Sequence, residues 1–164
     1  MAQEYPAHRL QLGGLVPRQI GALQRFGAVE LDPKIGHLVE MRASQINGCA
    51  FCLDMHSKDA RAAGETEARL YLLSAWRECP DYDERERAAL ALTEAMTVLE
   101  RGGVPDAIWD EAAARFSEEE LGALVVKIAA INAWNRLQIT TKAEPGHYQP
   151  GAFERAAEPV GAES

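Results

Sequence analysis

The chain of 164 residues is long enough for one domain with a substantial hydrophobic core and too short for two domains of ordinary size. Its composition, 47% apolar and 26% charged, is typical of a globular protein and excludes wholesale disorder, a collagen-like repeat or a small disulfide scaffold. The 17 basic and 25 acidic residues give a net charge of -8, which repels a phosphate backbone, and no cluster of Lys and Arg offsets it. We therefore expect no nucleic-acid partner.

The sequence also indicates a cellular compartment. The first ten residues, MAQEYPAHRL, lack the apolar stretch of a signal peptide, and no apolar run approaches the roughly 20 residues that cross a bilayer. Three cysteines, Cys49, Cys52 and Cys79, are too few and odd in number for an extracellular disulfide framework. We expect a soluble cytoplasmic protein without a membrane partner, in which a close cysteine pair indicates redox chemistry or metal binding.

The spacing of apolar residues predicts an all-α protein. Alternating runs typical of strands are nearly absent, whereas Ala, Leu and Glu recur at helical spacing. In chain order, the expected helices are 17–29, 33–47, 49–63, a short one at 65–76, 83–102, one that restarts after 104–105, and 117–139. Three of these starts carry a side chain that can cap the first turn: Asp32, Asp83 and Ser117. The last helix is apolar over more than half of its circumference, which predicts deep burial.

Residues 140–164 differ in composition from the helical region, because Pro and Gly become frequent there. They are expected to form an extended tail that wraps a neighbour or stays mobile. Residues 1–139 then make up the helical domain.

The candidate chemistry concentrates in residues 47–56, NGCAFCLDMH. Cys49, Cys52 and His56 follow one another at intervals of three and four, so on a helix they share one face. A pair at i and i+3 has its Cα atoms about 5 to 6 Å apart, which suits a reversible disulfide. The first helical turn favours a thiolate, and His56 is within reach of the thiol proton. Position alone does not rank the sulfurs, since Cys49 lies nearer the dipole end and Cys52 nearer His56.

Other interpretations of the cysteine pair stay open on the residues alone. It can be a buried structural pair with a satisfied histidine, or part of a zinc site completed by His37 or Cys79, although no second C-x-x-C supports zinc. A c-type haem is excluded because Leu53, not His, follows the pair. A thioredoxin-like domain is disfavoured because no strand-helix-strand pattern surrounds the motif.

Residues 41–60, MRASQINGCAFCLDMHSKDA, resemble the core of the alkylhydroperoxidase D-like branch of the carboxymuconolactone decarboxylase superfamily. Residues 131–137, INAWNRL, resemble the closing motif of that branch, so the similarity spans roughly residues 31–139. The resemblance implies a helical bundle of about six or seven helices and a homo-oligomer, commonly a trimer or hexamer. It also implies thiol-dependent reduction of organic hydroperoxides without a cofactor or metal.

The resemblance further assigns roles to individual residues. Cys52 is the peroxidatic thiolate, Cys49 the resolving cysteine, and His56 part of a proton relay. An external dithiol or thioredoxin-like protein is the expected reductant. A general thiol-disulfide oxidoreductase, a lactone decarboxylase and a zinc-stabilised scaffold are the alternative functions.

Two positions depart from the family pattern. Twelve residues before the first cysteine, where the family usually has a relay glutamate, this chain has His37, and Glu40 lies one helical turn later. We expect His37 or Glu40 to take over that role. Between the two cysteines, where better-studied members can carry a histidine, Phe51 cannot move a proton. Peroxidase activity is therefore expected to be weaker than in those members or directed at another substrate.

Overall fold

The computed structural model describes residues 8–152, which form eight α-helices and one 3₁₀ turn and contain no strand. The elements are α1 (Leu12–Leu15), α2 (Pro17–Gly27), α3 (Pro33–Asn47), α4 (Ala50–Ala62), α5 (Glu67–Leu72), η1 (Leu73–Ala75), α6 (Glu84–Thr97), α7 (Asp106–Arg115) and α8 (Glu118–Thr141). The prediction of an all-α fold is confirmed, with eight helices in residues 8–152 where about six or seven were expected. None of the helices within 8–152 is long and apolar enough to cross a membrane.

Capping side chains set the starts of three helices as predicted. The Asp32 carboxylate accepts a hydrogen bond from the Lys34 N–H at 2.9 Å, at the first turn of α3. Asp83 and Ser117 each form a full capping box with the glutamate three residues later, at the starts of α6 and α8. These contacts satisfy backbone N–H groups that have no partner within the helix.

The structure differs most from the sequence expectation at α1 and at the end of α6. The short α1 was not predicted, because two of its four residues are glycine and none of them is buried, so it leaves no apolar pattern. The α6 helix ends at Thr97 rather than near residue 102. The Oγ1 atom of Thr97 accepts a hydrogen bond from Asn132 of α8, so the last turn of α6 is tied to α8.

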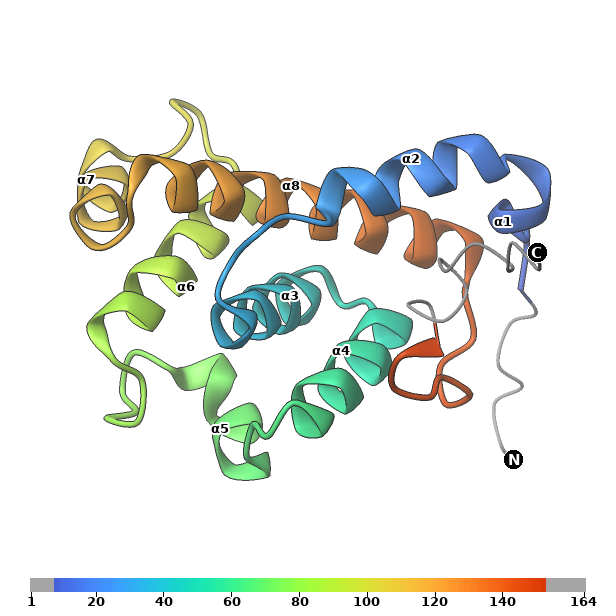
Figure 1. Cartoon of the computed structure of the whole chain (residues 1–164), viewed down its shortest axis with the longest axis horizontal. Helices are drawn as coiled ribbons and strands as arrows, with labels where there is room; N and C mark the ends of the chain where they lie inside the picture. Colours follow the sequence, from blue (N-terminus) through green and yellow to red (C-terminus); the bar gives the residue numbers. More distant parts are fainter. Residues whose placement is uncertain (1–7, 153–164) are drawn as a thin grey trace, which may run out of the picture.

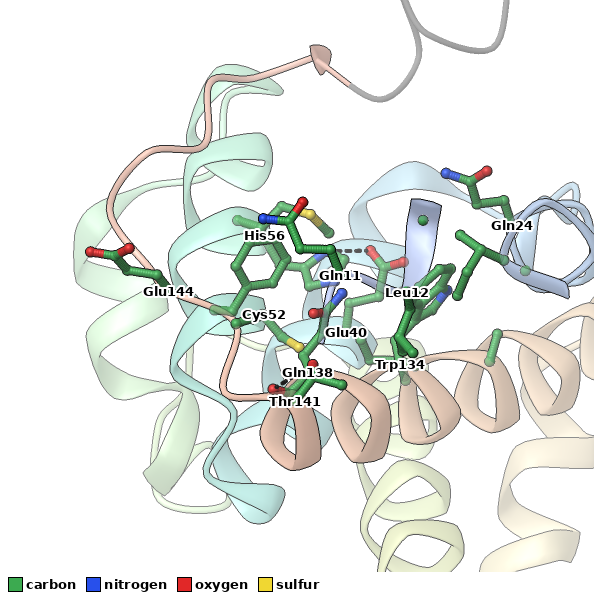
Figure 2. Close-up of a pocket in the computed structure, with 18 of the residues that line it drawn as sticks. Gln11, Leu12, Gln24, Glu40, Cys52, His56, Trp134, Gln138, Thr141 and Glu144 are labelled. Carbon is green, nitrogen blue, oxygen red and sulfur yellow. Dashed lines mark hydrogen bonds and ion pairs between the residues drawn. The ribbon is translucent and has the colours of Figure 1, made fainter. Parts of the chain in front are cut away.

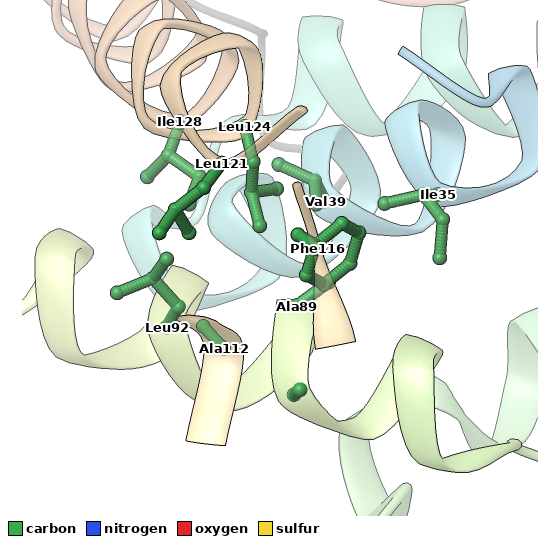
Figure 3. Close-up of a cluster of buried hydrophobic side chains, with 10 residues drawn as sticks. Ile35, Val39, Ala89, Leu92, Ala112, Phe116, Leu121, Leu124 and Ile128 are labelled. Atoms are coloured by element: carbon green, nitrogen blue, oxygen red, sulfur yellow. The ribbon is translucent and has the colours of Figure 1, made fainter. Parts of the chain in front are cut away.

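The long α8 helix is the centre of the fold and packs against α2, α3, α4, α6 and α7 (Figure 1). Its predicted deep burial is confirmed, because Leu121, Leu124, Ile128 and Ile131 are almost inaccessible to solvent. Side chains from α3, α6, α7 and α8 meet in one buried cluster (Figure 3). A second cluster joins α3 to η1 and α6. The two clusters hold α3 in place, and α3 carries one side of the candidate site.

After α8 the chain folds back onto α4. Gly146 donates its N–H to Asp54 at 2.9 Å, Lys58 donates to the Tyr148 carbonyl at 3.1 Å, and the Tyr148 hydroxyl donates to Asp59 at 2.8 Å. We call residues 143–152 the C-terminal strap. In Figure 1 it lies beside α4, beneath the end of α8. Residues 153–164 of the expected tail, and residues 1–7, lie outside the described residues.

Candidate active site

The turn between α3 and α4 positions the first cysteine, Cys49, at the start of α4. Gly48 has φ of +70°, in the left-handed region that side chains other than glycine rarely adopt, and it ends α3. Cys49 then donates its N–H to the Ser44 carbonyl and becomes the N-cap of α4 rather than its first helical residue. Its Sγ accepts the Cys52 N–H at 3.3 Å. The sulfur thus occupies the position where a capping oxygen usually lies.

Cys49 and Cys52 form a disulfide whose Cα atoms are 5.3 Å apart, within the expected range. Both residues are buried, with exposed fractions of 1% and 2%. Cys52 lines a large cavity, and Cys49 does not. A small molecule that enters the cavity therefore meets Cys52 first.

A buried amide network anchors the turn before the cysteines. The side-chain amide of Asn47 donates to the side-chain oxygens of Asn132 and Asn135 at 2.9 and 2.8 Å. Asn135, which is fully buried, donates in turn to the Ser44 hydroxyl at 3.0 Å. Every member has a partner, as buried polar groups require. Asn135 thus ties α8 to the end of α3.

His56 and Glu40 make the central polar contact. His56 has an exposed fraction of 7%, and its Nδ1 lies 3.3 Å from Oε2 of Glu40. Burial raises the pKa of the Glu40 carboxyl, but the charges and hydrogen bonds of His56 and Lys127 outweigh it and lower that pKa to about 2. Glu40 is therefore a carboxylate at neutral pH.

The structure distinguishes the two candidates for the missing relay glutamate. Glu40 contacts His56 directly, whereas Nδ1 of His37 lies 4.0 Å from Oε2 of Glu40. The same His37 nitrogen is buried without a hydrogen-bond partner among the described residues. Glu40 thus occupies the position next to the imidazole, and His37 lies behind it.

The large cavity has a volume of about 710 Å³ and a mainly apolar lining. Figure 2 shows Cys52 and His56 reaching it from α4, Glu40 from α3, and Trp134, Gln138 and Thr141 from α8. Residues of α1, α2 and the strap close the other sides. Such a cavity can hold an organic molecule next to Cys52.

A second cavity, of about 380 Å³, is lined by more polar residues. His37 and Asp59 line it, together with Pro150 and Gly151 of the strap. Glu40, His56 and Lys127 line both cavities. These three side chains, the charged partition, therefore separate an apolar space beside Cys52 from a polar one.

Lys127 is a functional candidate that sequence reasoning missed. It is the only charged residue between Leu121 and Asn135, in the most apolar part of α8. A lone lysine in such a stretch is itself a signal, because burial of its charge requires a partner. That partner is Glu40, whose Oε1 lies 3.0 Å from the Lys127 ammonium.

Cys79 does not join the cysteine pair. It is a buried free thiol in the cluster with Leu38 and Trp76. Within residues 8–152 no three His, Cys, Asp or Glu side chains are arranged to hold a metal ion. Among the described residues, Cys79 is therefore not placed to complete a zinc site with Cys49, Cys52 and His56.

Comparison with known proteins identifies the family. Residues 20–95 match the carboxymuconolactone decarboxylase family. The uncharacterized protein YdfG of Bacillus subtilis is 48% identical over 102 residues, which cover 62% of this chain and 69% of YdfG. The uncharacterized protein YnjA of Escherichia coli is 34% identical over 119 residues, 72% of this chain and 64% of YnjA.

Solved structures of similar proteins point to the same family. ATU0492 of Agrobacterium tumefaciens, a protein of unknown function proposed to be the antioxidant defence protein AhpD, superposes with a TM-score of 0.82 and 36% identity, covering 87% of this chain and all of that one. The debrominase Bmp8 shares the fold, with a TM-score of 0.70 and 23% identity over 87% of this chain and 76% of its own. The chain belongs to the alkylhydroperoxidase D-like branch of the carboxymuconolactone decarboxylase family.

Proposed function

We propose that the protein is a thiol-dependent peroxidase that reduces organic hydroperoxides through Cys52 and Cys49. One observation carries the proposal: a cysteine pair at disulfide distance has one sulfur, that of Cys52, on an apolar cavity that it shares with His56. The cavity provides space for the organic group of the peroxide. His56 provides an imidazole that can act as general base and then as general acid.

In the first step the Cys52 thiolate attacks the terminal oxygen of the peroxide. The O–O bond breaks, Cys52 becomes a sulfenic acid, and the organic oxygen leaves as an alcohol after taking a proton from the His56 imidazolium. Because Nδ1 of His56 faces Glu40, Nε2 is the nitrogen free to exchange that proton. Sulfur is oxidised by two electrons and the peroxide is reduced by two.

In the second step the Cys49 thiol attacks the sulfur of the Cys52 sulfenic acid. A disulfide forms and water leaves, which gives the bonded state seen in the structure. An external dithiol or thioredoxin-like reductant then returns both sulfurs to thiols by exchange and is itself oxidised. Since Cys49 is buried away from the cavity, the reductant attacks the sulfur of Cys52 first.

A homo-oligomer, a trimer or a hexamer, is part of the proposal. Large apolar side chains are exposed near α1 and α2, namely Leu15, Val16 and Phe26. Contact with further copies of the chain would remove them from water. Sedimentation velocity on the purified protein tests this, and a monomer at micromolar concentration would contradict it.

A general thiol-disulfide oxidoreductase is the alternative use of the same pair. The disulfide of Cys49 and Cys52 supports it, because such an enzyme uses a disulfide to oxidise other thiols. Peroxide consumption by the reduced protein separates the two functions.

Intact-mass analysis after one equivalent of cumene hydroperoxide tests the roles. The reduced parent protein should lose two hydrogens, Cys49→Ser should gain one oxygen that dimedone traps, and Cys52→Ser should do neither. Cys79→Ser is the matched control and should behave as the parent, since this thiol is buried elsewhere. Oxygen uptake by Cys52→Ser in place of Cys49→Ser would reverse the two roles.

A further inference from the structure

Lys127 reaches the charged partition from the apolar part of α8. Its ammonium lies 3.0 Å from Oε1 of Glu40 and 3.4 Å from the carbonyl oxygen of Gly27, at the end of α2. A Cβ atom at Gly36 would lie 3.5 Å from its Cε, an ordinary van der Waals distance, so the lysine stem passes close to α3 at this point. The side chain is 21% exposed. Lys127 thus joins three helices at one point.

The Glu40 carboxylate is divided between two partners. Oε1 contacts Lys127, and Oε2 contacts His56 at 3.3 Å. Each partner therefore has an oxygen of its own, and the carboxylate cannot rotate without loss of one contact. Such a fixed orientation determines where the imidazole ring of His56 lies.

Lys127 also balances the charge of Glu40. A buried carboxylate without a cation either takes up a proton or holds a proton on a neighbouring imidazole. With Lys127 present, the positive and negative charges next to His56 offset each other. His56 is then free to alternate between taking the Cys52 proton and giving one to the leaving alkoxide.

We propose that Lys127 is a positioning residue, which anchors one oxygen of Glu40 and offsets its charge, and thereby sets the pH range in which His56 and Cys52 exchange protons. The role rests on the proposed peroxidase function and acts through Glu40, not by contact with the substrate. Neither the family resemblance nor the cysteine motif assigns it.

Other titratable groups surround the same space. His37 lies on the helix of Glu40, Asp59 lies on α4 and lines the polar cavity with His56, and the carbonyl of Gly27 at the end of α2 contacts Lys127. His8 and Glu144 line the large cavity. Lys127 is the amine among these groups, and its Nζ lies 3.0 Å from Oε1 of Glu40.

The test measures the pH midpoint of Cys52 alkylation by iodoacetamide in the reduced Cys49→Ser protein. Lys127→Met leaves the charge of Glu40 without its cation, and that carboxylate then disfavours the thiolate form of Cys52. Proton uptake by neighbouring groups offsets only part of this charge. The alkylation midpoint should therefore move to higher pH. The acid limb of the peroxide rate should move in the same direction. Lys127→Arg keeps the charge and should restore a midpoint close to that of the parent.

Two controls separate positioning from general destabilisation. Lys34→Met breaks another lysine–glutamate contact, of 2.8 Å to Glu86, outside both cavities, and should leave the midpoint unchanged. In a Glu40→Gln background, Lys127→Met should shift the midpoint much less, because the partner through which it acts is gone. The double variant also removes the unpaired charge, which keeps the test usable if Lys127→Met folds poorly.

Different results would overturn the role of Lys127 and the proposed peroxidase function. An unchanged midpoint in Lys127→Met, or an equal shift with and without Glu40, overturns the role of Lys127. Failure of the parent protein to consume peroxide overturns the proposed function instead, and the alkylation midpoints still report on Lys127 in that case.

Discussion

Nδ1 of His56 lies 3.3 Å from Oε2 of Glu40, across the interface of α4 and α3. The contact engages Nδ1 of the imidazole ring, and His56 lines the same cavity as Cys52. Glu40 lies one helical turn after the position where the family usually has its glutamate. A carboxylate next to the imidazole is therefore present in this chain, at a different position and in contact with Lys127.

Replacement of Glu40 should impair the reaction more than replacement of His37. Glu40→Gln removes the charge that stabilises the His56 imidazolium, and we expect peroxide reduction to slow by about 10²-fold, the low end for loss of acid–base catalysis. His37→Gln should have a much smaller effect, because its Nδ1 lies 4.0 Å from Glu40. Stopped-flow tryptophan fluorescence of the reduced protein measures both rates. If His37→Gln reduces peroxide more slowly than Glu40→Gln does, the histidine is the relay group.

The N-terminal wall of the large cavity should select the size of the peroxide. Leu12 of α1 lines the cavity, whereas Leu15, on the same short helix, is exposed and does not. Leu12→Trp fills part of the space and should lower the rate with cumene hydroperoxide about tenfold, as expected for about 1.4 kcal/mol of lost binding. The rate with hydrogen peroxide should change little.

Leu15→Trp is the matched control for that substitution. It adds the same side chain outside the cavity and should leave the ratio of the two rates unchanged. An equal loss with both peroxides in Leu12→Trp would mean that the cavity does not hold the organic group.

The amide network before the cysteines should contribute to stability. Asn135→Ala removes one of the two acceptors of the Asn47 amide and the donor to the buried Ser44 hydroxyl, and we expect unfolding free energy to fall by about 1 to 3 kcal/mol. Urea denaturation measures the difference. Gln19→Ala, at an exposed position of α2, should change stability by less than about 0.5 kcal/mol. If the unfolding free energy of Asn135→Ala equals that of the parent, the network does not contribute to stability.

Glu40 should make the protein sensitive to acid. Its pKa is lowered from 4.5 to about 2 in the folded chain, so the folded state binds fewer protons than the unfolded state between these values. The stabilisation is present above about pH 4.5 and is lost as the pH falls towards 2. Unfolding free energy should therefore fall more steeply over this range in the parent than in Glu40→Gln.

Urea denaturation at several pH values below 5 checks this slope. Glu100→Gln is the control, because Glu100 is exposed and should leave the slope as in the parent. Parallel curves for the parent and Glu40→Gln would contradict an ionised Glu40 in the folded state.

Much of the helical pattern could be predicted because its causes are local. The starts of α3, α6 and α8 depend on Asp32, Asp83 and Ser117 and on backbone groups two or three residues away. The short α1 escaped prediction because its residues contact too little of the core to leave a pattern. The cysteine and histidine spacing likewise lies within three turns of one helix.

Long-range relationships in the site could not be read from the chain. Whether Glu40 or His37 faces His56 depends on the rotation of α3 against α4, which is determined by side chains packed from α6 and α8. The approach of Lys127 to Glu40 joins residues on two helices far apart in sequence, and the cavity has walls from both ends of the described chain. Short-range spacing and capping thus define the helices and the reactive pair, whereas packing between distant helices defines which charges and which space surround that pair.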